Sequence, residues 1–430
     1  MESWQILLHI AACLDWDAQQ IDIKMAFLYG LLPDDEVQYM EQPEDFVEPG
    51  FEDYVWMIER GLYGMKQAGR IWNKTMDSAL RSWGFNPLQS ESCIYYRILN
   101  GDIVIATIHV NDFLSIASLA AANQAFKDQM CTKWIISDLG EPKFCIGIAI
   151  SRDRALRNVS LSQVALIDKV IHQFGQEESY PLSVPFDPGL KLRRATSDTI
   201  TPEEQKQLAR LPYRSLIGCL LYLAIGTRPD ISYAVQQLSQ YLDSYSYTHW
   251  NAAIRVVRYL KGTRELKLVL GGTKNINLFG FSDSDWANCL DTRRSVGGYC
   301  FSLGSSIISW SAKKQKTVAT SSCEAEYTAA FEASKEAVWL RMLLHEINLG
   351  QEEPTRLLCD NNAAIALSED LGLHSRAKHI DIHYHFLREK VTEKNIALSY
   401  VNTRNNLADI FTKGLDRIKF TRLQQLLGLQ

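Results

Sequence analysis

Residues 93–112 read CIYYRILNGDIVIATIHVND, and this stretch decides the fold of the first part of the chain. Two apolar runs, Cys93–Leu99 and Asp102–Ile108, flank the dipeptide Asn100-Gly101. Asn-Gly between β-type runs favours a two-residue turn with positive φ at both residues, which is a common β-hairpin connection. We therefore expect a hairpin whose second strand carries Asn111 and Asp112 at its end.

The sequence on either side of this hairpin alternates between helical and β-type patterns. An apolar stretch, Ile6–Trp16, predicts a helix, and the run that follows it, Gln20–Phe27, has β-type character. After the hairpin, Ala120–Trp134 predicts a helix and Phe144–Ile150 predicts a strand. Elements that alternate in this way around one sheet indicate an α+β fold.

The rest of the chain divides into a helical block and a second region of mixed structure. Four helices are predicted in the block: Val164–Phe174, Tyr213–Ala224, Ile231–Tyr241 and Trp250–Lys261. From residue 275 the pattern predicts three antiparallel strands, a long helix over Cys323–Leu349, and then strand, helix, strand and a last helix that carries Asp409. We therefore predict three domains, which comprise residues 1–155, 156–267 and 275–420.

Composition and charge restrict the class of protein. The 430 residues are 46% apolar and 22% charged, which excludes a disordered tail, a collagen-like fibre and a small disulfide scaffold. Nine scattered cysteines without a C-x-x-C pair indicate reduced thiols inside the cell. No apolar run reaches about 18 residues, so we expect no membrane span.

The net charge of −5 is unevenly distributed. Residues 1–60, which include an acidic loop rich in Pro from Pro33 to Pro49, hold 14 acidic and two basic residues. Residues 186–267 hold 12 basic and seven acidic residues, and only this stretch leans toward the basic charge that a nucleic-acid binder needs. Charge alone does not identify the ligand.

Acidic side chains from elements far apart in the chain are the candidate catalytic residues. The last region offers four of them, and the first region offers two at the ends of β-type runs: Asp283, Glu326, Asp360, Asp409, Asp22 and Asp112. Carboxylate oxygens can hold two Mg²⁺ ions about 4 Å apart, which neutralise charge on the attacking and leaving oxygens when a phosphodiester breaks. Spacing alone leaves open that each is a solvated surface acid or a cap.

Four histidines between residues 374 and 385 raise the question of a zinc site. They are His374, His379, His383 and His385, and no cysteine or acidic residue stands at the spacing of a structural zinc site. We favour a helix surface or a nucleic-acid contact.

Twelve short motifs are spread along nearly the whole chain. They are Gln20–Leu28, Tyr39–Pro43, Leu62–Trp72, Asp138–Gly140, Phe144–Ile148, Tyr213–Leu238, Ser282–Ala287, Lys313–Gln315, Glu324–Tyr327, Asp360–Asn361, Lys378–Ile382 and Ala408–Lys413. In this order they resemble the reverse transcriptase–RNase H segment of copia-type LTR-retrotransposon polyproteins. Gln20–Leu28 is similar to polymerase motif A of that family, and Leu62–Trp72 to its LYGLKQAxRxW element.

This resemblance implies a fold and an activity. The fold would be α+β, with a truncated reverse-transcriptase palm sheet (1–155), a helical thumb and connection (156–267) and an RNase H-like α/β domain with a mixed five-stranded sheet (275–420). The activity would be RNA-directed DNA synthesis, then cleavage of RNA in RNA–DNA hybrids by two-metal hydrolysis with Mg²⁺ or Mn²⁺. The implied partners are an RNA template, a DNA primer, the hybrid, dNTPs and other polyprotein regions, and no membrane. The implied location is a cytoplasmic particle or the nucleus.

The resemblance also assigns roles to residues of this sequence. Asp22 and Asp112 would ligate the polymerase metals, and Asp283, Glu326, Asp360 and Asp409 would form the RNase H tetrad. In two places an alternative acid stands nearby, and we prefer Asp283 to Asp285 and Glu326 to Glu324. Lys66, Gln67 and Arg70 would lie at the incoming nucleotide, and Phe144 and Gly147 at the primer grip.

Two departures from the family pattern bear on activity. Asn111 replaces the first acid of the family's Val-Asp-Asp motif, so a metal ligand loses its negative charge. We expect polymerase activity to fall by about a thousandfold or more, against the alternative that Asn111 is a harmless strand-end residue. In the family roughly a hundred residues that form the fingers precede motif A, and we expect a copy that is truncated there.

Two other classes of function stay open. One is a catalytically inactive transposon relic, or a nucleic-acid-binding module that holds hybrid without cutting it. The other is a cellular RNase H with a helical appendage, which would leave the resemblance around Asp22 and Lys66 unexplained.

Overall fold

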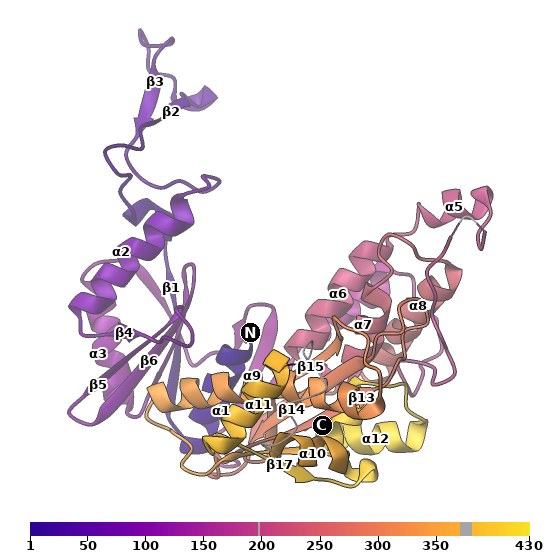
Figure 1. Cartoon of the computed structure of the whole chain (residues 1–430). Helices are drawn as coiled ribbons and strands as arrows, with labels where there is room; N and C mark the ends of the chain where they lie inside the picture. The colour runs from indigo at the N-terminus through magenta and orange to yellow at the C-terminus, as the bar shows by residue number, and fades with distance from the viewer. Residues whose placement is uncertain (197, 370–380) are drawn as a thin grey trace. The chain divides into compact units, whose positions relative to one another are not determined.

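The contacts in the computed structural model divide the chain into two compact units (Figure 1). The structure describes residues 1–196, 198–369 and 381–430. The inserted unit is 15–142, and the main unit consists of 1–14 together with 143–430. The N-terminal helix therefore belongs to a different unit from the strand that follows it. The predicted three-domain division stays a prediction.

The inserted unit is built on a six-stranded sheet in the order β4-β5-β6-β7-β1-β8. Its strands are β4 (Asn86–Pro87), β5 (Ile94–Leu99), β6 (Asp102–His109), β7 (Asp112–Ala117), β1 (Asp17–Ile23) and β8 (Ile136–Gly140). All neighbouring strands are antiparallel. Helices α2 (Ala68–Ser82) and α3 (Ala120–Cys131) share one apolar core with the sheet, in which Trp72, Met76 and Phe126 are buried.

Two tight turns join the strands at the centre of this sheet. Asn100 and Gly101 connect β5 to β6 with φ values of 54° and 87°, which confirms the predicted hairpin. At the other end of β6, Val110 has a φ of 62° and the chain reverses into β7. The sequence analysis missed β7, so Asp112 begins a strand and does not follow one. The strand is almost wholly buried and lacks the alternation that reveals a half-exposed strand.

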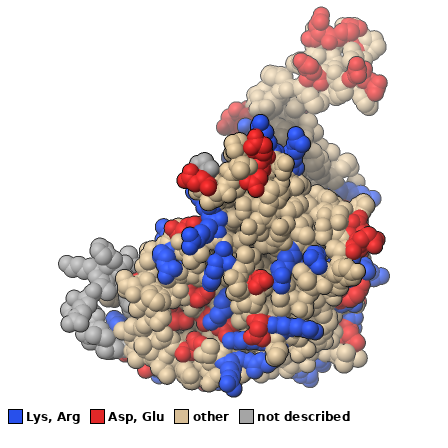
Figure 2. Space-filling view, turned by 90° about the vertical axis from the view of Figure 1, so that its right-hand side faces the viewer, with Lys and Arg blue, Asp and Glu red and all other residues tan. Residues whose placement is uncertain are grey.

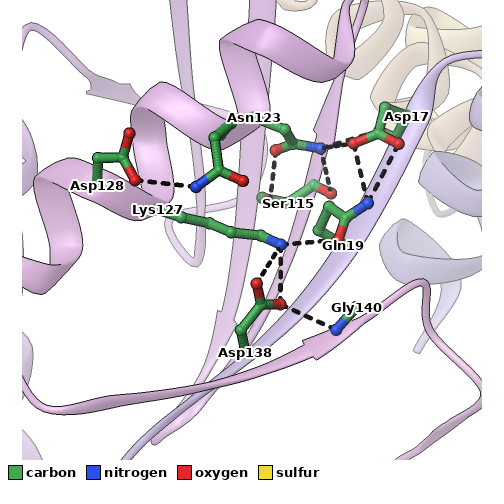
Figure 3. A network of polar contacts seen from close by, with 9 residues as sticks. Asp17, Gln19, Ser115, Asn123, Lys127, Asp128, Asp138 and Gly140 are labelled. Atoms are coloured by element: carbon green, nitrogen blue, oxygen red, sulfur yellow. Dashed lines mark hydrogen bonds and ion pairs between the residues drawn. The ribbon is translucent and has the colours of Figure 1, made fainter.

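A polar network attaches α3 to the sheet (Figure 3). The side chain of Lys127 is only 7% exposed, and its ammonium donates to both carboxylate oxygens of Asp138 at 2.8 Å and to Gln19 at 2.8 Å. The Asn123 amide donates to the Asp17 carboxylate at 2.9 Å. A buried ammonium without partners is costly, so these contacts fix α3 on β1 and β8.

The acidic segment Pro33–Pro49, which was predicted as a loop, contains the first strand of a hairpin. Strand β2 (Gln38–Glu41) pairs antiparallel with β3 (Val55–Ile58). Its aromatic side chains are exposed, with Tyr39 at 64% and Tyr54 at 66%. Asp and Glu side chains surround its tip, at the top of Figure 2. Strands of four residues with two exposed faces carry no apolar periodicity, which is why the pattern did not reveal them.

The main unit begins with a four-stranded antiparallel sheet in the order β12-β11-β10-β9. Its strands are β9 (Phe144–Cys145), β10 (Ile148–Asp153), β11 (Asn158–Ser162) and β12 (Leu268–Gly271), and helix α1 (Glu2–Leu14) packs against β11 and β12. The prediction of one strand over Phe144–Ile150 was wrong. Ile146 and Gly147 have φ values of 42° and 73°, and this turn divides the run into β9 and β10.

Helices occupy most of the segment between β11 and β12. They are α4 (Val164–Gln173), α5 (Pro202–Leu208), α6 (Tyr213–Gly226), α7 (Ser232–Ser239) and α8 (Tyr247–Gly262). The four predicted helices are present, and α5 was not predicted. Arg228 and Asp230, between α6 and α7, form a fully buried ion pair of 2.8 Å. The Tyr259 hydroxyl and Gln424 of the C-terminal helix α12 (Arg417–Leu426) also donate to Asp230, so this pair links α12 to the helical block.

The last part of the main unit is a five-stranded sheet in the order β15-β14-β13-β16-β17. Its strands are β13 (Leu278–Asp285), β14 (Val296–Leu303), β15 (Ser306–Lys314), β16 (Thr355–Cys359) and β17 (Ile396–Tyr400). β15, β14 and β13 are antiparallel, whereas β13, β16 and β17 are parallel, so the predicted mixed sheet is confirmed.

One long helix lies against this sheet. Helix α9 (Ser322–Glu346) packs on β13, β14 and β16. Ser321 is its N-cap and accepts a hydrogen bond from the Glu324 amide. The helix ends at Glu346, three residues before the predicted end at Leu349. Helices α10 (Asn362–Glu369) and α11 (Asp381–Thr392) stand between β16 and β17 in the chain.

No single helix among the described residues is long and apolar enough to cross a membrane. The bent pair of α5 and α6 passes that test by length and composition only.

Candidate active sites

Three of the predicted carboxylates meet at one end of the five-stranded sheet. Asp283 lies on β13, Asp360 directly follows the parallel neighbour β16, and Glu326 lies in the second turn of α9. Their ligand oxygens all lie within 4.8 Å of one another, and they form the only group of this kind among the described residues. We call these three residues the carboxylate cluster.

The electrostatics of this cluster favour a bound cation. Burial, followed by the charges of Asp283 and Asp360, raises the pKa of Glu326 to about 9. Burial also raises the pKa of Asp283 to about 7, although the Lys413 ammonium opposes this shift. Glu326 Oε2 is buried and has no hydrogen-bond partner in the described structure. A positive charge placed among the three residues would relieve each of these costs.

The fourth predicted acid, Asp409, lies beside the cluster and is bound by lysines. It is fully buried in a 3₁₀ turn, η5 (Leu407–Phe411), and the prediction that it stands on the last helix was wrong. Lys413 Nζ lies 2.7 Å from Asp409 Oδ1, and Lys419 Nζ contacts Oδ2. Lys413 Nζ is also 3.3 Å from Asp283 Oδ2.

Short-range contacts hold the η5 turn against the sheet. The Asn406 amide donates to the backbone carbonyl of Ser282 at 3.0 Å, and its oxygen caps the turn. Gly298 on β14 permits the close approach, since a Cβ at this position would lie 2.7 Å from the Cβ of Phe411. The Thr412 hydroxyl donates to Asp283 Oδ2. These contacts place the turn next to the carboxylate cluster.

Neighbouring acids that were weighed as alternatives lie outside the cluster. Asp285 is two residues beyond Asp283 on β13 and is not part of the group within 4.8 Å. Glu324 accepts hydrogen bonds from the Thr320 amide at 2.7 Å and hydroxyl at 2.6 Å, so its carboxylate is engaged at the start of α9. The geometry therefore agrees with the preference for Asp283 and Glu326, whose catalytic roles stay predictions.

The inserted unit brings its two predicted carboxylates face to face. Asp22 on β1 and Asp112 on β7 are directly paired in the antiparallel register. Burial, followed by the charge of Asp22, raises the pKa of Asp112 above its usual range. Asn111 stands in the turn before β7, and its amide nitrogen donates to Asp22 Oδ1. The Asn111 side chain therefore meets Asp22 as a hydrogen-bond donor where the family has an acid.

The five residues predicted to contact nucleotide or primer lie at two places. Lys66 and Arg70 are exposed around the start of α2, where Gln67 is the N-cap, and Arg70 pairs with Glu36 at 2.5 Å. Phe144, which is 57% exposed, and Gly147 belong to the β9–β10 hairpin of the main unit. Their roles stay predictions.

Some residues of the site were missed by the sequence analysis, and others lie outside the described structure. Lys413 belongs to a motif that was noted, but its spacing of four from Asp409 was not used as a signal of an ion pair. Lys419, ten residues from Asp409, gave no signal. The predicted contacts of His374 and His379 lie outside the described residues.

Comparison with known proteins identifies the family. A family model described as "Reverse transcriptase (RNA-dependent DNA polymerase)" matches residues 1–188. The chain is 37% identical over 430 residues to the retrovirus-related Pol polyprotein from transposon TNT 1-94 of Nicotiana tabacum, covering 100% of this chain and 32% of that protein. It is 31% identical over 317 residues to a transposon Ty5-1 protein of Saccharomyces cerevisiae, covering 74% of this chain and 100% of that protein. The chain belongs to the copia-type retrotransposon Pol family.

Membership in the copia-type family agrees with the fold. The foamy viral protease–reverse transcriptase, solved in complex with dsDNA, superposes with a TM-score of 0.50 at 11% identity, over 90% of this chain and 68% of that one. The predicted fold class, a reverse-transcriptase sheet and helical region followed by an RNase H-like domain, is confirmed. The chain spans about a third of the length of the tobacco polyprotein.

Proposed function

We propose that this chain cleaves the RNA strand of RNA–DNA hybrids with the carboxylate cluster of its main unit. The observation that carries the proposal is the convergence of Asp283, Glu326 and Asp360, whose ligand oxygens lie within 4.8 Å of one another. Three carboxylates this close repel each other unless protons or cations lie among them. In a member of a reverse-transcriptase family, such a cluster fits phosphodiester hydrolysis.

Divalent cations fit the carboxylate cluster for two reasons, the type of its donor atoms and the lack of a hydrogen-bond partner for one buried carboxylate oxygen among the described residues. The donors are hard carboxylate oxygens, which Mg²⁺ and Mn²⁺ prefer. Glu326 Oε2 is buried without a hydrogen-bond partner among the described residues, and burial, followed by the neighbouring carboxylates, raises its pKa; burial also raises the pKa of Asp283. Asp283, Glu326 and Asp360 would hold Mg²⁺ or Mn²⁺, with Asp409 close by.

The protein's own part in hydrolysis is to position these groups. Bound cations would supply positive charge that stabilises the attacking and leaving oxygens. Adjacent parallel strands bring Asp283 and Asp360 together, and α9 adds Glu326 to the same group of oxygens. The Thr412 hydroxyl donates to Asp283 Oδ2 and so orients that carboxylate. Burial raises the pKa of Glu326 to about 9, so this carboxyl would favour its protonated form at neutral pH in the absence of a cation.

The proposed substrate is a nucleic-acid duplex with at least one RNA strand. Lys and Arg side chains are spread over the face on which α8 and α12 lie (Figure 2). Exposed basic residues such as Lys191, Arg193 and Arg194 would contact phosphates, so binding should weaken steeply with salt. The solved foamy viral relative in fold was captured with dsDNA. The proposed partners include other polyprotein regions. The proposed location is a cytoplasmic particle or the nucleus.

We propose that DNA synthesis by the inserted unit is impaired. Asp22 and Asp112 are paired as polymerase metal ligands would be. Asn111 brings no negative charge, and its amide nitrogen occupies Asp22 Oδ1, an oxygen that a cation would need. The loss of metal-based charge stabilisation corresponds to about a thousandfold or more in rate. RNA template, DNA primer and dNTPs are the proposed partners of this site, at which DNA synthesis is slow.

Cleavage of a labelled RNA–DNA hybrid by the purified chain in Mg²⁺ or Mn²⁺ tests the main proposal. We expect cuts in the RNA strand that disappear in Asp360→Asn. Asp243→Asn is the matched control, since Asp243 is an exposed acid of the same unit whose ion pair among the described residues is with the exposed Arg214. Binding of hybrid without any cuts would favour the alternative, a non-catalytic binding module or an inactive relic.

A further inference from the structure

Lys413 occupies the space between Asp283 and Asp409. Its ammonium lies 2.7 Å from Asp409 Oδ1 and 3.3 Å from Asp283 Oδ2. Asp409 is fully buried and Asp283 is 1% exposed, so both carboxylates are held firmly inside the domain. One positive charge is thus shared by two buried negative charges.

This ammonium stands where a cation shared by the same two carboxylates would have to stand. Mg²⁺ binds oxygen at 2.0–2.1 Å, so a cation bridging Asp283 and Asp409 and an ammonium within 3.3 Å of both cannot occupy that space together. The ammonium and a divalent cation would also repel each other, because both are positively charged. The carboxylate cluster has no such obstacle, because no lysine pairs with Glu326 or Asp360 among the described ion pairs.

The lysine can leave, whereas the acids cannot. The side chain of Lys413 is 32% exposed, and it follows the C-cap residue of the η5 turn. Its flexible four-carbon stem allows the ammonium to swing toward solvent. Lys419, which is 27% exposed, contacts Asp409 on its other oxygen and does not pair with Asp283.

We propose that the ammonium of Lys413 occupies the position of a second cation and competes with it, so that the two cation sites differ in affinity. The carboxylate cluster binds the first cation directly. The second cation binds between Asp283 and Asp409 only when the ammonium of Lys413 moves out. Lys413 is thus a positioning residue that sets the cation concentration at which the site is filled. This inference rests on the proposed function, since it requires the cluster to bind a cation.

Calorimetric titration of the full chain with Mn²⁺ tests the inference independently of cleavage. All proteins carry Asp112→Asn, so that the inserted unit does not contribute a binding step. We expect a stronger and a weaker step with Lys413 in place. In Lys413→Met, which keeps the length of the side chain and loses its charge, the weaker step should tighten by about tenfold or more. Lys413→Arg keeps the charge and should keep the weak step.

Lys419→Met serves as the matched control, because it removes a lysine from the same carboxylate without clearing the space beside Asp283. Its effect on the second step should be clearly smaller. If Lys413→Met does not fold, Lys413→Gln replaces it, and the rise in Tm with Mn²⁺ gives a second readout. An unchanged second step in the neutral variants, with the first step intact, would overturn this inference and leave the proposed function standing. Absence of the first step would instead count against the proposed function.

Discussion

Asn111→Asp is the most informative perturbation of the inserted unit, because it should lower stability and raise activity at once. The wild-type amide donates a hydrogen bond to the Asp22 carboxylate. The substitution removes that bond and places a third carboxylate beside Asp22 and Asp112, which are directly paired across β1 and β7.

The size of the stability change follows from these contacts. A hydrogen bond to a charged group contributes about 1.5–3 kcal/mol. The added repulsion is screened, since all three side chains are partly exposed, and amounts to about 1 kcal/mol. We therefore expect the free energy of unfolding to fall by about 3 kcal/mol at pH 7 without divalent cations. Saturating Mg²⁺ should restore about 2.7 kcal/mol at a hundred times its Kd.

Urea unfolding and primer extension on the same proteins measure the two effects. We expect extension by the wild type to be slower by about a thousandfold than extension by Asn111→Asp. Asn100→Asp is the matched control: the same chemical change in an exposed turn residue with positive φ, which Asp also tolerates. Equal extension by wild type and Asn111→Asp, or no gain in stability from Mg²⁺, would refute the reasoning.

Three further changes probe the main unit. Cation affinity of the carboxylate cluster should rise as the pH rises through about 7 and about 9, the raised pKa values of two of its members, and calorimetry in buffers of different ionisation enthalpy should detect released protons. Without cations, the folded protein should lose stability as the pH rises. Because these two carboxyls bind protons more tightly in the folded state, stability is full below about pH 4, declines toward the raised pKa values and levels off above about pH 9, as urea unfolding would show. Gly298→Ala places a Cβ 2.7 Å from Phe411, so it should displace the η5 turn and reduce hybrid cleavage while far-UV circular dichroism stays unchanged. Arg228→Met leaves the fully buried Asp230 without its cation and should cost about 3–5 kcal/mol in thermal unfolding.

The sequence predicted those parts of the fold that depend on local signals. Asn100-Gly101 fixed a hairpin because few residues other than Asn and Gly adopt positive φ easily. The strand from Asp112 was missed because its side chains are buried on both faces. The turn at Ile146-Gly147 was missed because a single Gly inside an apolar run does not by itself show whether a strand continues or reverses.

The candidate site was predicted in its acids but not in its counter-ions. The motifs supplied Asp283, Glu326 and Asp360, which the fold brings together from segments far apart. The ion pairs of Asp409 depend on the path of the chain after the η5 turn. The spacing of four between Asp409 and Lys413 could have indicated their ion pair, but the approach of Lys413 to Asp283 depends on this path and follows from no local pattern.

The course of the chain through its two units imposes an order on biosynthesis. The ribosome makes helix α1 before the inserted unit, yet the strands against which it packs, β11 and β12, emerge only after the whole inserted unit. Until then the apolar face of α1 has no native surface to cover it and is exposed to chaperones or to aggregation. The closing contact is formed late but at modest entropic cost, since the cost of joining the ends of a long excursion grows only with the logarithm of its length.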